Sequence, residues 1–131
     1  MEKATGKNIR TFRDLVAWQK GVALARLVYR LTGPFPSDER FGLVIQMRRA
    51  VVSIPANIAE GYGRGSRQEY IRYIQIARGS LFELQTHAEI AHGQGWMTDS
   101  ALREFNQSTE EVDRIVSGLL RSLKRPATTD P

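Results

Sequence analysis

The chain has 131 residues, a formal net charge of +5 and no cysteine. This length suits a single domain with one core, and 41% apolar with 25% charged residues is typical of a globular chain. The lack of cysteine excludes disulfides, zinc–thiolate sites and thiol nucleophiles. The sequence has no run of about 20 apolar residues and no apolar signal core in residues 1–13, so we expect a cytoplasmic protein without a membrane span.

The apolar periodicity predicts four helices and no strand. The first helix runs from about Asp14 to Thr32 and ends before Gly33 and two nearby prolines. The side chains that we expect it to bury are Leu15, Trp18, Val22, Ala25 and Tyr29. A second apolar set, on nearly the opposite face, predicts an oligomer interface through Leu24, Leu27, Val28 and Leu31.

The second helix is predicted to follow an N-cap at Ser37 and to end near Gly61–Gly63. Pro55 lies inside this helix and removes one backbone donor, which predicts a kink. Its expected core stripe consists of Phe41, Val44, Ile45, Val51, Val52, Ile58 and Ala59.

The third helix is predicted to open with a capping box at Ser66–Glu69, in which each side chain accepts from the other residue's backbone amide. It runs from Arg67 to about His92. Its core stripe consists of Tyr70, Tyr73, Ile74, Ala77, Leu81, Leu84, Ala88 and Ala91. Ile71 and Phe82 point away from this stripe and extend the predicted oligomer interface.

Thr98 is the predicted N-cap of a fourth helix, from Asp99 to about Lys124. Four helices joined by short loops predict an all-α fold, the antiparallel up-down-up-down four-helix bundle. We expect the bundle over residues 14–125, between an N-terminal extension (1–13) and a disordered tail (126–131).

The charges are unevenly distributed along the chain. Residues 40–78 contain seven basic and two acidic side chains, whereas residues 79–120 contain two basic and seven acidic ones. This polarity suits an anionic partner such as RNA. It equally suits self-association, with the basic half of one copy against the acidic half of the next, or simply uneven solvated faces.

The second helix carries a polar line formed by Arg49, Ser53, Asn57, Glu60 and Arg64, which share one side of the helix. The line is either a solvated face or a ladder of donors for phosphates or for a partner's backbone.

Arg48 is different, because it lies inside the apolar stripe and needs either a partner for its charge or a route by which its head group reaches water. A carboxylate on the third helix, Glu83 or Glu89, is the favoured partner.

Two motifs are weak evidence for chemistry. The run "GYGRGS" lacks the preceding strand of a phosphate-binding loop, so capping turns explain it better than a phosphate site does. The Glu89–His92 spacing "EIAH" is that of di-iron bundles, but only one copy exists, so we expect no metal. His87 is interpreted as an interior or interface histidine, and the sequence contains no catalytic constellation that we can identify.

The central block "RRAVVSIPANIAEG" followed by "RGSRQEYIRY", with "FRDLVAWQKGVALARLVYRLT" before it, resembles the four-helix-bundle proteins encoded in 23S ribosomal RNA intervening sequences. The resemblance covers residues 12–124. It implies a homopentameric barrel with a central channel and an association with RNA. The accessory protein of diversity-generating retroelements looks like a structural relative, and it forms a basic pentameric barrel that contacts nucleic acid.

We therefore expect a non-enzymatic, homopentameric protein that associates with RNA through a basic surface and needs no cofactor. Asn57 and Glu60 are expected to organise that surface. Its predicted phosphate contacts are Arg48, Arg49, Arg64, Arg67, Arg72 and Arg78. The alternative is a protein-interaction or assembly module, without a nucleic-acid role, whose charge polarity serves assembly.

Overall fold

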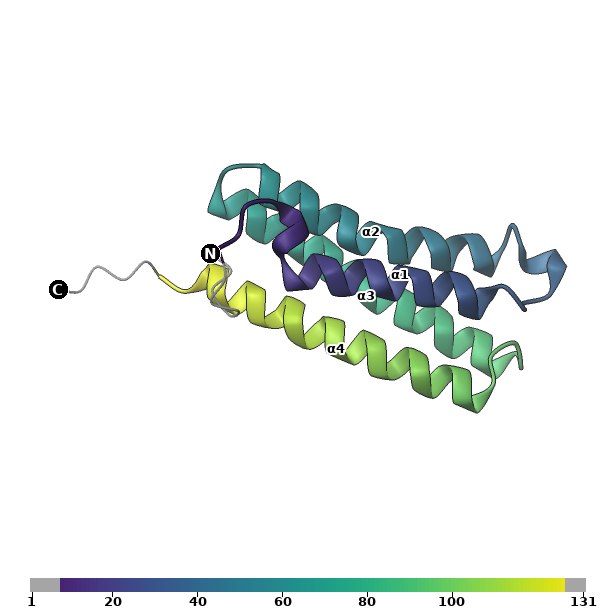
Figure 1. Cartoon of the computed structure of the whole chain (residues 1–131). Coiled ribbons are helices and arrows are strands. Elements are labelled where there is room, and N and C mark those ends of the chain that lie inside the picture. Colours follow the sequence, from purple (N-terminus) through teal and green to yellow (C-terminus); the bar gives the residue numbers. More distant parts are fainter. Residues whose placement is uncertain (1–7, 127–131) are drawn as a thin grey trace.

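The computed structural model describes residues 8–126. Its elements are η1 (Phe12–Asp14), α1 (Val16–Thr32), η2 (Ser37–Glu39), α2 (Leu43–Gly63), α3 (Arg67–Gly93) and α4 (Asp99–Lys124). Each α-helix runs opposite to the one before it (Figure 1), and contacts join α1 to α2, α2 to α3, α3 to α4 and α4 back to α1. The predicted all-α four-helix bundle is confirmed. The predicted tail lies outside the described residues apart from Pro126.

The starts of the last two helices follow the local capping chemistry. The Ser66 hydroxyl accepts a hydrogen bond from the Glu69 amide at 3.1 Å, and the Thr98 hydroxyl accepts one from the Ala101 amide at 3.0 Å. Both contacts satisfy backbone donors that have no partner inside the helix. The predicted bounds of the fourth helix are confirmed at both ends.

The predicted start of the second helix is wrong. Ser37 opens only the short helix η2, and α2 begins at Leu43, whose amide donates to the Glu39 carboxylate at 3.1 Å. Phe41 therefore precedes the helix and is 84% exposed. Ile45 and Val52 also face outward. The buried residues of α2 are Val44, Met47, Ala50, Val51, Ile54, Pro55, Ile58 and Gly61.

The core face predicted for the first helix is confirmed in part, because Leu15 is buried and Trp18 and Ala25 pack against the core. The predictions for Tyr29, Leu24 and Val28 are wrong. The buried residues of α1 are Ala17, Gly21, Leu24, Val28 and Thr32, whereas Tyr29 is 46% exposed. Leu24 and Val28 are each 1% exposed, so they have no surface left for another subunit. The prediction was based on the large side chains. It missed the small residues Ala17 and Gly21, which are buried on the face of α1 that packs against α2.

Glycines set the distances between α2 and both of its neighbours. A Cβ atom added at Gly21 would lie 3.2 Å from the Cβ of Pro55, and one added at Gly61 would lie 2.7 Å from the Cβ of Tyr73. The helix α2 continues through Pro55, which is buried and faces Gly21. The kink predicted at Pro55 stays a prediction.

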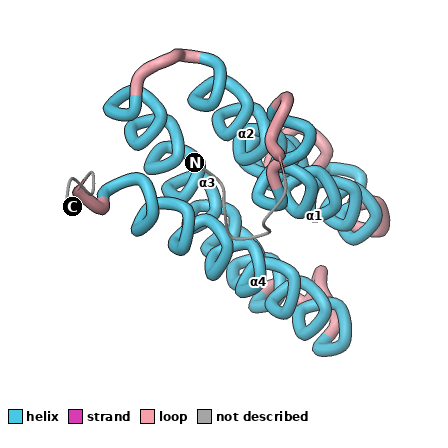
Figure 2. Tube along the Cα trace, turned by 60° about the vertical axis from the view of Figure 1, so that its left-hand side comes forward, coloured by secondary structure: helices cyan, strands magenta, loops and turns pink. Residues whose placement is uncertain are grey.

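The residues just before α1 belong to the packed structure. Ile9 and Phe12 pack against the core, and the rings of Phe12 and Trp18 meet edge to face with their centroids 5.2 Å apart. A capping box between Thr11 and Asp14 holds η1. This segment, the α2–α3 loop and the end of α4 lie at one end of the bundle, and the other two connections lie at the opposite end (Figures 1 and 2).

Between residues 8 and 126, no helix is long and apolar enough to cross a membrane.

Substituting Gly61→Ala should lower the free energy of unfolding by up to about 2 kcal/mol. Overpacking against Tyr73 typically costs about 1–3 kcal/mol, and alanine's better helix propensity offsets about 1 kcal/mol of that. The control is Gly79→Ala in α3, where the added methyl group meets no atom within 4 Å; it should raise stability by about 0.5–1 kcal/mol. Urea unfolding measures both, and equal effects of the two substitutions would contradict the close approach.

Candidate nucleic-acid interface

Part of the polar line of α2 lies in the contact between α2 and α3. The hydroxyl oxygens of Ser53 and Ser80 are 2.9 Å apart. The Asn57 amide group donates to the Ser53 carbonyl and hydroxyl oxygens, both at 2.8 Å. All three side chains are half-buried. Ser53 joins α2 to α3, whereas Asn57 bonds within α2, so neither stands free as a donor for a ligand.

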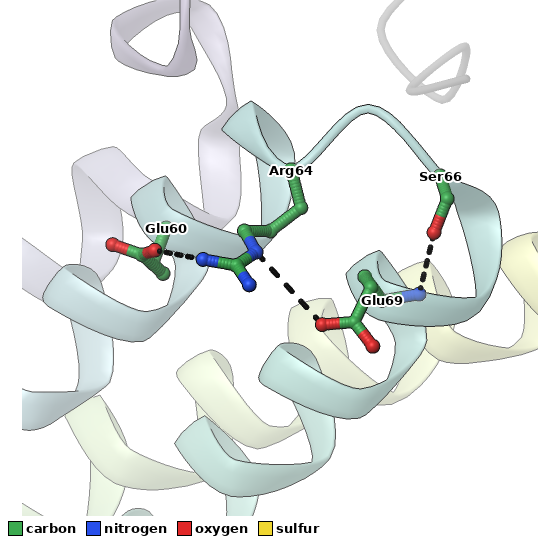
Figure 3. A network of polar contacts seen from close by, with 4 residues as sticks. All are labelled: Glu60, Arg64, Ser66 and Glu69. Carbon is green, nitrogen blue, oxygen red and sulfur yellow. Dashed lines mark hydrogen bonds and ion pairs between the residues drawn. The ribbon is translucent and has the colours of Figure 1, made fainter.

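Arg64 is held between two carboxylates at the α2–α3 turn (Figure 3). Its Nη1 lies 3.0 Å from Glu60 Oε2, and its Nε lies 3.8 Å from Glu69 Oε1. The hydrogen bond with Glu60 is the main cause that raises the pKa of Arg64, so this residue stays a cation. Because the Glu69 carboxylate faces Arg64, the predicted capping box at Ser66 forms only its serine half.

The "GYGRGS" run ends one helix and turns into the next. Gly61 and Gly63 are helical, and only Gly65, with φ of +86°, adopts the left-handed conformation that favours glycine. The capping interpretation therefore fits this segment.

The carboxylate partner predicted for Arg48 is wrong. Arg48 Nε donates to Thr32 Oγ1 at 3.0 Å, and Nη2 donates to the Tyr29 carbonyl at 3.3 Å. The guanidinium also lies over the Tyr29 ring, 4.5 Å from its centroid. Arg48 thus caps the C-terminal end of α1, where carbonyl oxygens lack helical partners and a positive charge is favourable.

The remaining predicted arginines differ in what they contact. Arg78 pairs with Asp113 of α4 at 3.0 Å and lies over the Phe82 ring. Arg49, Arg67 and Arg72 are exposed and have no carboxylate partner among residues 8–126. These three cations are the ones left to attract an anion.

The structure does not gather the six arginines on one surface. Arg64, Arg67 and Arg72 lie at the α2–α3 turn. Arg78 bridges α3 and α4 instead. The other two line a groove of about 330 Å³ formed by Tyr29, Ile45, Arg48, Arg49 and Val52.

Four of the predicted interface residues keep some surface. Leu27, Leu31 and Ile71 are half-buried against the core. Phe82 is 45% exposed and lines a groove of about 410 Å³ between α3 and α4. Sequence reasoning missed the groove beside Arg48, because it assigned Tyr29, Ile45 and Val52 to the core.

The histidine of the "EIAH" motif pairs with one carboxylate outside the motif. His92 Nε2 lies 2.7 Å from Asp99 Oδ1 across the α3–α4 loop. The part of the chain that the structure describes contains no group of three or more histidine, cysteine or acidic residues that could hold a metal ion. His87 is 8% exposed, and its Nε2 lies 3.7 Å from Glu83 Oε2.

These observations define a small four-helix bundle whose α2–α3 hairpin carries exposed arginines. The chain belongs to the 23S rRNA-intervening sequence protein family, whose model matches residues 13–118. It is similar to the crystal structure of a protein with unknown function from the S23 ribosomal protein family of Bacteroides thetaiotaomicron, with a TM-score of 0.74 over 81% of this chain and 96% of that chain. The two are 22% identical, so the likeness shows the fold alone. No curated protein matches the sequence.

Substituting Arg48→Met should lower the free energy of unfolding by about 1–2 kcal/mol, because the change removes two hydrogen bonds to the end of α1. Arg49→Met is the matched control on the next residue, and it should change stability by less than about 0.5 kcal/mol. Chemical unfolding of the two variants measures this difference. A similar loss of stability in both would show that Arg48 does not cap α1.

The pKa of Asp99 provides a test of its pairing. The hydrogen bond from His92, followed by the charge of that ring, lowers the pKa of Asp99. The contribution of Asp99 to stability is therefore present above the pKa that it has in the unfolded chain, and is lost as the pH falls through its folded pKa. His92→Ala should raise the pKa of Asp99 towards its ordinary value in an NMR titration of the carboxyl carbon. Glu89→Gln is the control; an unchanged pKa in the His92 variant would contradict the pairing.

Proposed function

We propose that this protein is a non-enzymatic, homo-oligomeric protein that associates with RNA through the arginines of its α2–α3 hairpin. The observation that carries the proposal is the exposure of Arg67 and Arg72 at the start of α3, without a carboxylate partner in the described chain. Arginine side chains of this kind bind phosphate groups through a planar set of donors.

The surroundings of the hairpin arginines favour a binding role. Arg64 and Arg72 both lie over the ring of Tyr73, with guanidinium-to-centroid distances of 5.4 and 5.1 Å. Stacking on the ring orients the Arg72 guanidinium while leaving its edges open to an anion, whereas the Arg64 guanidinium is engaged by Glu60 and Glu69. Asn57 and Glu60 support this surface indirectly: Asn57 bonds within α2, and Glu60 positions Arg64.

The choice of RNA over DNA in this proposal comes from the family's name. The family is named after 23S rRNA intervening sequences, and this name associates its genes with ribosomal RNA. We extend that association to the protein itself and propose that RNA is its ligand. Arg49 is an additional phosphate contact in this proposal, because it too is exposed without a carboxylate partner among residues 8–126.

Exposed apolar side chains support the proposed oligomer, and the proposed number of five copies rests on the resemblance to the family. Phe82 and Ile90 of α3 are 45% and 51% exposed, and Ile45 and Val52 of α2 are 39% and 45% exposed. Apolar residues on two faces of one small bundle suit a ring, in which one face of each copy meets a different face of the next. These same residues favour the alternative, an assembly module without a nucleic-acid role.

The wild-type protein should bind an RNA stem–loop of about 30 nucleotides, and its affinity should fall steeply between about 50 and 200 mM salt. The double variant Arg67→Gln with Arg72→Gln should reduce the slope of log affinity against log salt by about one unit for each phosphate contact that it removes. Fluorescence anisotropy measures both quantities.

The matched control is Arg26→Gln with Arg114→Gln, which removes the same charge from exposed positions on α1 and α4. It should leave the slope nearly unchanged. If the wild-type protein does not bind at the lowest salt, the proposed function is wrong. If the hairpin variant changes the oligomer mass in light scattering and has no effect on RNA, the assembly alternative is favoured.

A further inference from the structure

One end of the bundle collects cations from three segments that are distant in the sequence. The segment before α1, the α2–α3 turn and the last turn of α4 meet there (Figures 1 and 2). We call this surface the basic end. Among residues 8–126, its eight basic residues are Arg10, Arg13, Arg64, Arg67, Arg72, Arg121, Lys124 and Arg125.

The carboxylates at the basic end are engaged in local contacts. The Asp14 carboxylate accepts hydrogen bonds from the amides of Arg10 and Thr11, at 2.8 and 3.1 Å. Glu60 and Glu69 both face Arg64. In the described part of this end, eight basic side chains thus stand against three acidic ones, an excess of five. Within residues 8–126, every ion pair at this end is made by Arg64.

The composition of the basic end favours a nucleic acid over a membrane surface. Seven of its eight cations are arginines, whose planar donors suit phosphates and stacked bases. A protein that lies on a membrane also inserts large apolar side chains. The described apolar residues that are most exposed all lie elsewhere: Tyr29, Phe41, Ile45, Val52, Ile76, Phe82 and Ile90.

We propose that the basic end is the surface on which RNA lies, and that it contacts the phosphodiester backbone end-on to the helices. Arg121, Lys124 and Arg125 are then phosphate contacts in addition to Arg67 and Arg72. This inference rests on the proposed function and places its contact surface. Because a helix is about 10–12 Å across, the turn of α2–α3 and the end of α4 together reach several phosphates of one strand.

The end-on position has a consequence for an assembled ring. A cyclic assembly relates its copies by rotation alone. With the helices along the rotation axis, the basic ends of all copies lie on the same rim. One RNA molecule then meets several basic ends, and their contacts reinforce one another through a high effective concentration.

The test uses the full chain and the stem–loop of about 30 nucleotides, with affinity measured between about 50 and 200 mM salt. The triple variant Arg121→Gln, Lys124→Gln and Arg125→Gln should reduce the salt slope by about one unit for each phosphate that is no longer bound. The matched control is Arg26→Gln, Arg103→Gln and Arg114→Gln, which removes the same charge from exposed positions away from the basic end. The control should keep the wild-type slope to within about half a unit.

Three further measurements test for misfolding of the variant, for contacts to the ribose hydroxyl and for binding to membranes. The pair Arg121→Lys and Arg125→Lys keeps the charge and should retain the salt slope, which separates the removal of charge from misfolding. A DNA hairpin of the same length distinguishes contacts to the phosphate alone, which leave the two affinities equal, from contacts that also use the ribose hydroxyl. Vesicles of phosphatidylserine and phosphatidylcholine should not bind.

The two proposals fail in different ways. If the wild-type protein binds RNA and the hairpin variant weakens binding, but the α4 variant binds like the wild type, the end-on surface is wrong and the proposed function stands. Binding to the vesicles that depends on Arg121, Lys124 and Arg125, with RNA binding unaffected, also overturns the inference. A wild-type protein that does not bind RNA overturns both.

Discussion

The close approach of α2 to its neighbours is the constraint on which the arrangement of side chains in this bundle depends. A Cβ at Gly61 would lie 2.7 Å from the Cβ of Tyr73, so α2 and α3 meet almost backbone to backbone. At this separation the short side chains of Ser53 and Ser80 reach each other, and Arg64 spans carboxylates on both helices. The backbone of the hairpin therefore has a defined geometry, which sets where its exposed arginines leave the helices.

The arginines of the basic half of the chain divide into structural and exposed groups. Arg48 caps α1 through Thr32, and Arg78 pairs with Asp113 of α4, so both connect helices. Arg67 and Arg72 make no ion pair within residues 8–126. Their charge adds to that of the segments before α1 and at the end of α4, which the bundle brings to the same end (Figure 2). Only three of the seven basic residues in 40–78, Arg64, Arg67 and Arg72, therefore contribute to the basic end.

The sequence predicts the parts of the fold that depend on local chemistry. The caps at Ser66 and Thr98, and the regular stripe of α4, give the helices and the all-α class. The sequence predicts less well which face of a helix packs against which neighbouring helix. Gly21 faces the core because Pro55 lies against it, and no periodicity of large residues reveals that contact. The candidate site shows the same limit: the residue types that bind phosphate are visible in the sequence, but whether an arginine is engaged by another helix depends on packing.

NMR spectra of the 15N-labelled protein, recorded with and without the RNA stem–loop, show whether RNA contacts the basic end of the bundle. Residues 10–13, 64–72 and 121–125 should show the largest shift changes, and residues 33–42 and 93–98 at the opposite end should show none. Changes confined to that opposite end, or to the groove around Tyr29 and Val52, would contradict a contact at the basic end.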